Sequence, residues 1–148
     1  MTSHPVNQLE VIYCDDIREE ASGKRTLVGV YRAALIVPAF PAVLPKFCVM
    51  LNYLCSVSDA PEKVHFKLYR DDAVLGEHVV PDGSLRKMPK LADSQAALHC
   101  ASVVMEFAPF GLLGPCVLRV RAEVDGVELR TSALSIQAKE ATAPTQIS

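Results

Sequence analysis

The chain has 148 residues, half of them hydrophobic, and a formal net charge of −2. This length suits one domain with a sizeable core, and the scattered charges include no basic run that would favour nucleic acid or an anionic membrane as a partner. Every apolar run ends well short of the roughly 18 residues that a membrane span needs, and no secretion signal is recognised near the first residue.

Apolar and polar residues alternate with the period of a β-strand in nearly every segment. The first two strands are expected at 9–17 and 26–31 and should form a hairpin. Gly29, inside the second strand, predicts a bulge or a close approach of another group to the backbone. A short strand follows at 34–37, and three prolines between positions 38 and 45 predict an irregular crossing between sheets.

Two later segments, 47–57 and 99–107, are apolar at nearly every position. A strand with two apolar faces either lies centrally in the fold or has one face against a partner. Between these strands, the segment 81–98 is expected to be a long loop. Loops of this length in a compact domain are commonly functional or mobile.

Two further hairpins are expected. One pairs 63–69 with 74–80 through a tight turn at Asp71-Asp72. The other spans 118–130, where Asp125-Gly126 suits the two central positions of a type I′ turn. Apolar residues share one face of this second hairpin, and charged residues share the other, where opposite charges can meet diagonally.

These eight or nine strands predict an all-β fold, specifically an antiparallel immunoglobulin-like β-sandwich. A closed barrel is the alternative. The chain has no Trp, so the Cys–Trp–Cys core of antibody domains is absent and only the architecture is predicted. We expect one domain over residues 1–138 and a flexible tail over 139–148, where the sequence becomes small and polar.

The five cysteines lie inside apolar, strand-like runs and form no CxxC pair. An odd number of such thiols favours reduced, buried side chains that pack as small hydrophobes. Reduced thiols are typical of an intracellular protein. The expected location is therefore the cytoplasm.

The opening of the chain carries Tyr13-Cys-Asp-Asp-Ile-Arg18, then Gly23-Lys24 and Gly29-Val-Tyr31, with a proline-rich crossing at 36–46. This "CDDIR…GK…GVY" arrangement resembles a family of small bacterial and phage-associated proteins of unknown function. The resemblance is strongest over the first third of the chain. It implies no catalytic residue, and it raises the alternative of a phage-derived assembly component.

An acidic cluster ends the first predicted strand, where Asp15 and Asp16 precede Glu19 and Glu20. Carboxylate oxygens are the ligands that Ca²⁺ prefers, so these residues are a candidate cation site. The EF-hand spacing is absent, however, and basic residues lie close by in the sequence. The alternative is a solvated turn with local ion pairs.

Among the four histidines, His65 and His78 fall on the two strands of one expected hairpin. Counting back from the turn places them opposite each other, near Glu77 or Glu62. Two histidines and a carboxylate could bind Zn²⁺ or serve a hydrolase. The alternative is an exposed cross-strand pair.

No sequence pattern indicates an enzyme, because GxSxG and the phosphate-binding glycine loops are absent. We expect no cofactor and no catalytic residue. The expected function is a non-catalytic binding or structural module that associates with itself, as a homodimer, or with another protein. The contact would use a sheet face or edge and apolar residues from both all-apolar strands and a nearby loop. The candidate interface residues are Met50, Leu54, Val104, Phe110, Leu112 and Leu113.

Overall fold

The computed structural model describes residues 6–88 and 98–140, and these fold into strands with one short 3₁₀ turn, Val57–Asp59. Four strands form one antiparallel sheet in the order β2-β1-β5-β8. Their bounds are Arg25–Tyr31 for β2, Asn7–Glu19 for β1, Phe47–Ser56 for β5 and Leu98–Phe107 for β8.

A six-stranded sheet has the order β3-β12-β10-β6-β7, with β11 paired to β10 beside β12. Its only parallel pair within residues 6–88 and 98–140 joins β3 to β12. A small third sheet pairs β4 with β9. The bounds are Ala34–Val37 (β3), Leu134–Ala138 (β12), Cys116–Val124 (β10), Val64–Arg70 (β6), Ala73–Val80 (β7), Val127–Arg130 (β11), Ala42–Leu44 (β4) and Phe110–Leu112 (β9).

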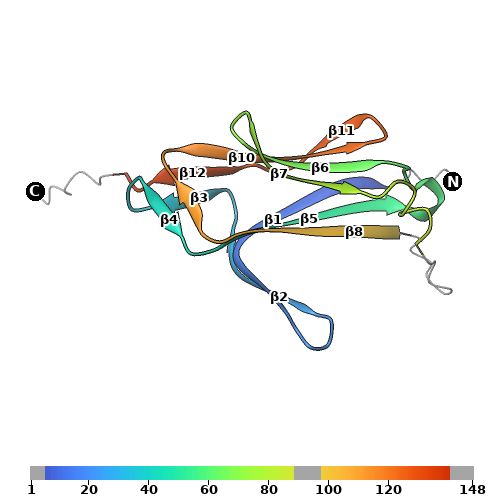
Figure 1. Cartoon of the computed structure of the whole chain (residues 1–148), viewed down its shortest axis with the longest axis horizontal. Coiled ribbons are helices and arrows are strands. Elements are labelled where there is room, and N and C mark those ends of the chain that lie inside the picture. Colours follow the sequence, from blue (N-terminus) through green and yellow to red (C-terminus); the bar gives the residue numbers. More distant parts are fainter. Residues whose placement is uncertain (1–5, 89–97, 141–148) are drawn as a thin grey trace, which may run out of the picture.

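The two larger sheets lie in separate layers, with β10, β6 and β7 on one side and β1, β5 and β8 on the other (Figure 1). The described part of the chain is all-β. Both larger sheets are open, so the fold is not a closed barrel. The twelve strands among residues 6–88 and 98–140 exceed the eight or nine expected, because short strands such as β4, in the proline-rich segment, and β9 also form. The proline-rich segment does cross between sheets, since β3 and β5 belong to different ones.

The core lies between the two layers. Along β10, alternate side chains are buried, and along β5 the odd-numbered positions from Phe47 to Cys55 face the same interior. The Phe47 ring stacks on Phe110 with centroids 4.8 Å apart and on Tyr13 at 6.4 Å. Through these ring contacts β5 packs against the small third sheet and against β1. The contacts help to position the four-stranded sheet, whose outer face is described below.

The predicted turn at Asp125-Gly126 is confirmed. Both residues have positive φ, 46° and 85°, as a type I′ turn requires. The Asp125 carboxylate also accepts hydrogen bonds from the backbone N–H groups of Glu62 and Lys63, the latter at 2.8 Å. On the outer face, Glu128 lies 3.7 Å from Arg121 on the neighbouring strand, the diagonal pairing of opposite charges that the sequence predicted.

The hairpin of β6 and β7 departs from its predicted register. The turn at Asp71-Asp72 begins as expected, with Arg70 opposite Ala73. A bulge then shifts the pairing between Leu68 and Tyr69, so that His65 lies opposite Val79 and His78 lies opposite Phe66. The expected His65–His78 pair is therefore wrong, because one extra residue in β7 moves His78 to the other face of the sheet.

Two other expectations fall partly outside the described residues. Residues 81–88 form turns. Residues 89–97 of the expected 81–98 loop lie outside the described residues, and β8 begins at Leu98. Of the expected 139–148 tail, only Lys139 and Glu140 are described, and neither belongs to a strand.

Candidate functional site

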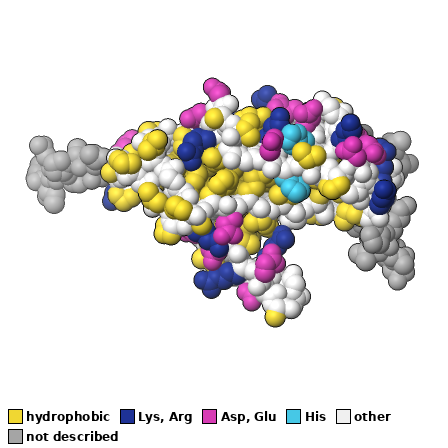
Figure 2. Space-filling model, in the orientation of Figure 1, with side chains coloured by type: hydrophobic (Ala, Val, Ile, Leu, Met, Phe, Trp, Pro, Cys, Tyr) yellow, Lys and Arg dark blue, Asp and Glu magenta, His cyan; other side chains and the backbone are white. Residues whose placement is uncertain are grey.

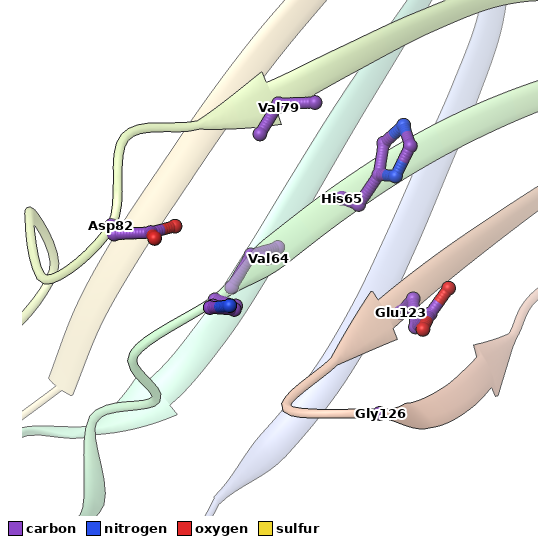
Figure 3. Close-up of a pocket in the computed structure, with 7 residues that line it drawn as sticks. Val64, His65, Val79, Asp82, Glu123 and Gly126 are labelled. Atoms are coloured by element: carbon purple, nitrogen blue, oxygen red, sulfur yellow. The ribbon is translucent and has the colours of Figure 1, made fainter.

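His65 lies on the outer face of the six-stranded sheet, where its Nε2 is 3.0 Å from the Glu77 carboxylate. Glu123 is directly opposite His65 on β10. His65, Glu123 and Asp82 line an open hollow of about 310 Å³ (Figure 3). Among the residues that the structure describes, its lining includes no Ser, Thr or Cys that could act as a nucleophile.

The expected metal site is not assembled around these histidines. His78 faces the side of the sheet opposite to His65, since its neighbour across the ladder is the buried Phe66. Among residues 6–88 and 98–140, no group of three His, Cys, Asp or Glu side chains is arranged to hold a metal ion. In the described part of the chain, His65 is thus paired with the Glu77 carboxylate and with no second imidazole.

Asp15 and Asp16 do not converge on a cation site either. Successive strand residues point to opposite faces, and the two carboxylates have separate partners. Asp15 accepts a hydrogen bond from the Tyr31 hydroxyl. Asp16 lies 2.7 Å from the Lys46 ammonium and 3.2 Å from the Arg18 guanidinium. Hydrogen bonds from Lys46 and then Arg18 hold the pKa of Asp16 below its usual value.

Gly29 explains how Asp15 fits beside β2. It has a φ of +66°, and an added Cβ would come within 2.1 Å of an Asp15 carboxylate oxygen. The predicted close approach at Gly29 is therefore confirmed, and the atom that approaches is a side-chain oxygen.

The cysteines are all free thiols. Cys14, Cys48 and Cys55 are buried, but Cys100 is exposed and Cys116 is half-buried, so the expectation of five buried thiols is wrong. Burial raises the pKa of Cys14 to about 11. A thiol with a raised pKa is a poor nucleophile at neutral pH, so Cys14 does not have the character of a catalytic cysteine.

The outer face of the four-stranded sheet is apolar at its centre. Ile12, Met50 and Val104 lie directly across from one another on β1, β5 and β8 and form one row, which we call the central row. On the same face, Val28 and Val30 of β2 are 38% and 53% exposed. An outward face of a sandwich is normally polar, so this composition is unusual for a surface that only meets water.

The opposite outer face, on the six-stranded sheet, has the expected polar character. Lys67 and Arg121 are neighbours there, as are His65 and Glu123. The outer face of the six-stranded sheet is therefore largely charged, whereas that of the four-stranded sheet has an apolar central row beside a polar row of Glu10, Asn52 and Ser102.

A second group of exposed apolar residues lies at one end of the molecule. Leu113 is 88% exposed, Val43 67% and Ile36 53%. Figure 2 shows hydrophobic side chains gathered at this end, over β3 and β4, whereas charged side chains gather on the projecting hairpin of β1 and β2.

The six predicted interface residues separate into three groups. Met50, Leu54 and Val104 lie on the outer face of the four-stranded sheet, but Met50 is only 9% exposed and is a buried member of this group. Leu113 is at the apolar end of the molecule. Phe110 and Leu112 are 2% and 1% exposed and belong to the core, so their assignment to a surface patch is wrong. They are buried because β9 pairs with β4 and turns both side chains inward.

One surface residue that sequence reasoning missed is Arg25. From the start of β2 its guanidinium reaches across the outer face, lying 3.9 Å from the Met50 sulfur and donating to the Ser102 hydroxyl at 2.9 Å. It is also paired with Glu19 at 2.8 Å. Because β2 and β8 are at opposite ends of the strand order, the tip of the β1–β2 hairpin must bend over this face. No spacing in the sequence signals such a contact.

Residues 10–137 match the model of a family described as "Family of unknown function (DUF6941)". The chain belongs to this family. The match covers both larger sheets of the DUF6941 fold and includes the Tyr13–Tyr31 opening and the central row. No curated protein matches the chain. In the described part of this DUF6941 protein, no helix is long and apolar enough to cross a membrane.

Proposed function

We propose that the protein is a non-catalytic binding module of immunoglobulin-like architecture that associates with itself through its four-stranded sheet. The observation that carries the proposal is the apolar centre of that sheet's outer face, set against the charged outer face of the other sheet. Apolar area removed from water contributes about 25 cal/mol per Å², so a contact that covers any part of the central row is favourable. In this proposal the partner is another copy of the chain in the cytoplasm, with no nucleic acid and no membrane involved.

The arrangement of titratable groups supports a module rather than an enzyme. The hollow beside His65 has one imidazole, and its carboxylates come from separate elements. The buried thiols Cys14 and Cys48 both have raised pKa values because of desolvation. General acid–base catalysis needs titratable groups held together at one site, whereas the two buried thiols and the His65 hollow lie on different sheets.

Light scattering over a range of concentrations tests the proposal. We expect a mass that rises above 16.1 kDa. Val104→Lys on the central row should return the protein to a monomer, whereas Val79→Lys, on the outer face of the other sheet where Val79 is 57% exposed, should not. A native protein that stays monomeric at high concentration would contradict the proposal. Co-purification from the native host tests whether the assembly belongs to a phage-derived particle.

A further inference from the structure

The β8 strand is an open edge of the four-stranded sheet. All ten of its residues pair with β5 without any shift, from Phe47 opposite Phe107 to Ser56 opposite Leu98. On its other side no strand pairs with it among residues 6–88 and 98–140. Half of its backbone N–H and C=O groups therefore point away from the sheet.

The other strands at sheet edges carry features that discourage pairing. The pairing of β7 with β6 is broken by a bulge. Gly29, with positive φ, interrupts β2. Both β3 and β11 are only four residues long. Bulges, irregular residues and short length are the means by which proteins protect exposed edges.

By contrast, β8 has none of these protections. It contains no proline, lysine, arginine or glycine, and its one acidic residue is Glu106. Its apolar side chains lie on both faces, with Val104 outward and Met105 packed against the core. A long, regular and weakly charged edge of this kind is suited to accept another strand.

We infer that β8 pairs antiparallel with β8 of a second copy, with the two Val104 residues facing each other across a two-fold axis. This inference rests on the proposed function and places its contact at the sheet edge, where the two Val104 side chains cover each other and the rest of the central row is not covered. In this register the central row continues from Ile12, Met50 and Val104 into the same three residues of the second copy. Two four-stranded sheets then become one sheet of eight strands with a continuous apolar stripe.

In this register, opposite charges on the two copies lie close together, which favours a second copy as the partner of β8. Facing Val104 residues place Glu106 opposite Ser102 of the second copy, and Ser102 is the residue to which Arg25 donates at 2.9 Å. Each Glu106 carboxylate then meets an Arg25 guanidinium of the other copy, and the two-fold axis repeats the contact. Parallel pairing of the same strands in register would instead set two Glu106 side chains side by side, which is unfavourable.

Disulfide cross-linking tests the register. In a Cys100→Ser background, Val104→Cys places two thiols directly opposite each other, about 5 Å apart between Cβ atoms. The matched control, Val103→Cys in the same background, leaves the two thiols offset by two residues. Their Cα atoms are then about 8 Å apart, beyond the reach of a disulfide. Under mild oxidation, Val104→Cys should form a reducible covalent dimer at least about tenfold faster than Val103→Cys.

A second pair of variants tests the charge contact. Arg25→Gln should raise the dissociation constant of the dimer about tenfold, because a charge pair at a contact contributes on this scale. Lys46→Gln should change it less than about twofold, since Lys46 contacts Glu106 at 3.3 Å within one copy.

The outcomes separate this inference from the proposed function. A native dimer in which Val104→Cys and Val103→Cys cross-link equally slowly would overturn the β8 contact and leave self-association in place. A monomeric native protein that forms no covalent dimer with either variant would overturn both. Faster cross-linking of Val103→Cys would overturn the register.

Discussion

The Asp125 carboxylate connects two neighbouring hairpins, and its removal should lower stability by a predictable amount. The side chain accepts hydrogen bonds from the backbone N–H groups of Glu62 and Lys63, at 3.1 and 2.8 Å. Asp125 also has a φ of 46°, a left-handed conformation that Asp and Asn tolerate better than Ala. Asp125→Ala therefore removes two acceptor contacts and places an unsuitable residue in the turn.

The magnitude follows from these two effects. A hydrogen bond to an ionised group contributes about 1.5–3 kcal/mol, but exposure to water weakens both contacts, so we take about 1.5 kcal/mol for the two together. The left-handed conformation costs Ala about 1 kcal/mol more than Asp. We expect Asp125→Ala to lower the free energy of unfolding by about 2.5 kcal/mol. Asp125→Asn keeps the conformation and one acceptor oxygen, so its loss should be about 1 kcal/mol.

Urea unfolding followed by circular dichroism measures both losses as shifts of the midpoint at constant slope. Asp72→Ala is the matched control, because Asp72 occupies the corresponding turn of the β6–β7 hairpin and is exposed; its loss should stay below about 0.5 kcal/mol. A loss below about 1 kcal/mol for Asp125→Ala would refute the reasoning. Equal losses for Asp125→Ala and Asp125→Asn would show that the charge alone matters.

Three further predictions concern the core, the thiols and acid stability. Phe47→Ala should lower the free energy of unfolding by about 3–5 kcal/mol, measured by urea unfolding, because Phe47 is fully buried and stacks on another ring. A loss under about 1 kcal/mol would show that the site collapses around the gap. Iodoacetamide at pH 8 should modify exposed Cys100 before buried Cys14, whose pKa is about 11; peptide mass spectrometry reads the order, and equal rates would contradict the burial argument. Because Lys46 lowers the pKa of Asp16 in the native state, the pair stabilises the fold above the ordinary aspartate value of 3.8, and this contribution is lost as the pH falls through the lowered pKa. Asp16→Asn should therefore flatten the acid limb of a stability–pH curve, and an unchanged limb would count against the pairing.

Alternation along the chain was enough to predict the all-β class and the face on which most residues lie. The parity of the 47–57 segment separates Met50 and Leu54 from the core positions, and the structure places both on the outer face. The Asp125-Gly126 turn was predictable because few residue pairs accept two positive φ values. These features depend on neighbouring residues only.

The errors arose where distant parts of the chain decide the outcome. Counting from the Asp71-Asp72 turn could not reveal the bulge that separates His65 from His78, because a bulge depends on how both strands pack. Phe110 and Leu112 were assigned to a loop near the apolar strands, yet pairing with β4 buries both. The position of Arg25 over Ser102 depends on the bend of a whole hairpin.

The parallel pairing of β3 with β12 has a consequence for synthesis of the chain on the ribosome. Ala34 lies opposite Ser135, and Val37 lies opposite Ala138. The segment that completes this edge is translated about a hundred residues after β3 itself. Nascent β3 must therefore wait without its hydrogen-bonding neighbour until β12 has left the exit tunnel, and this late step should make folding of the domain slow.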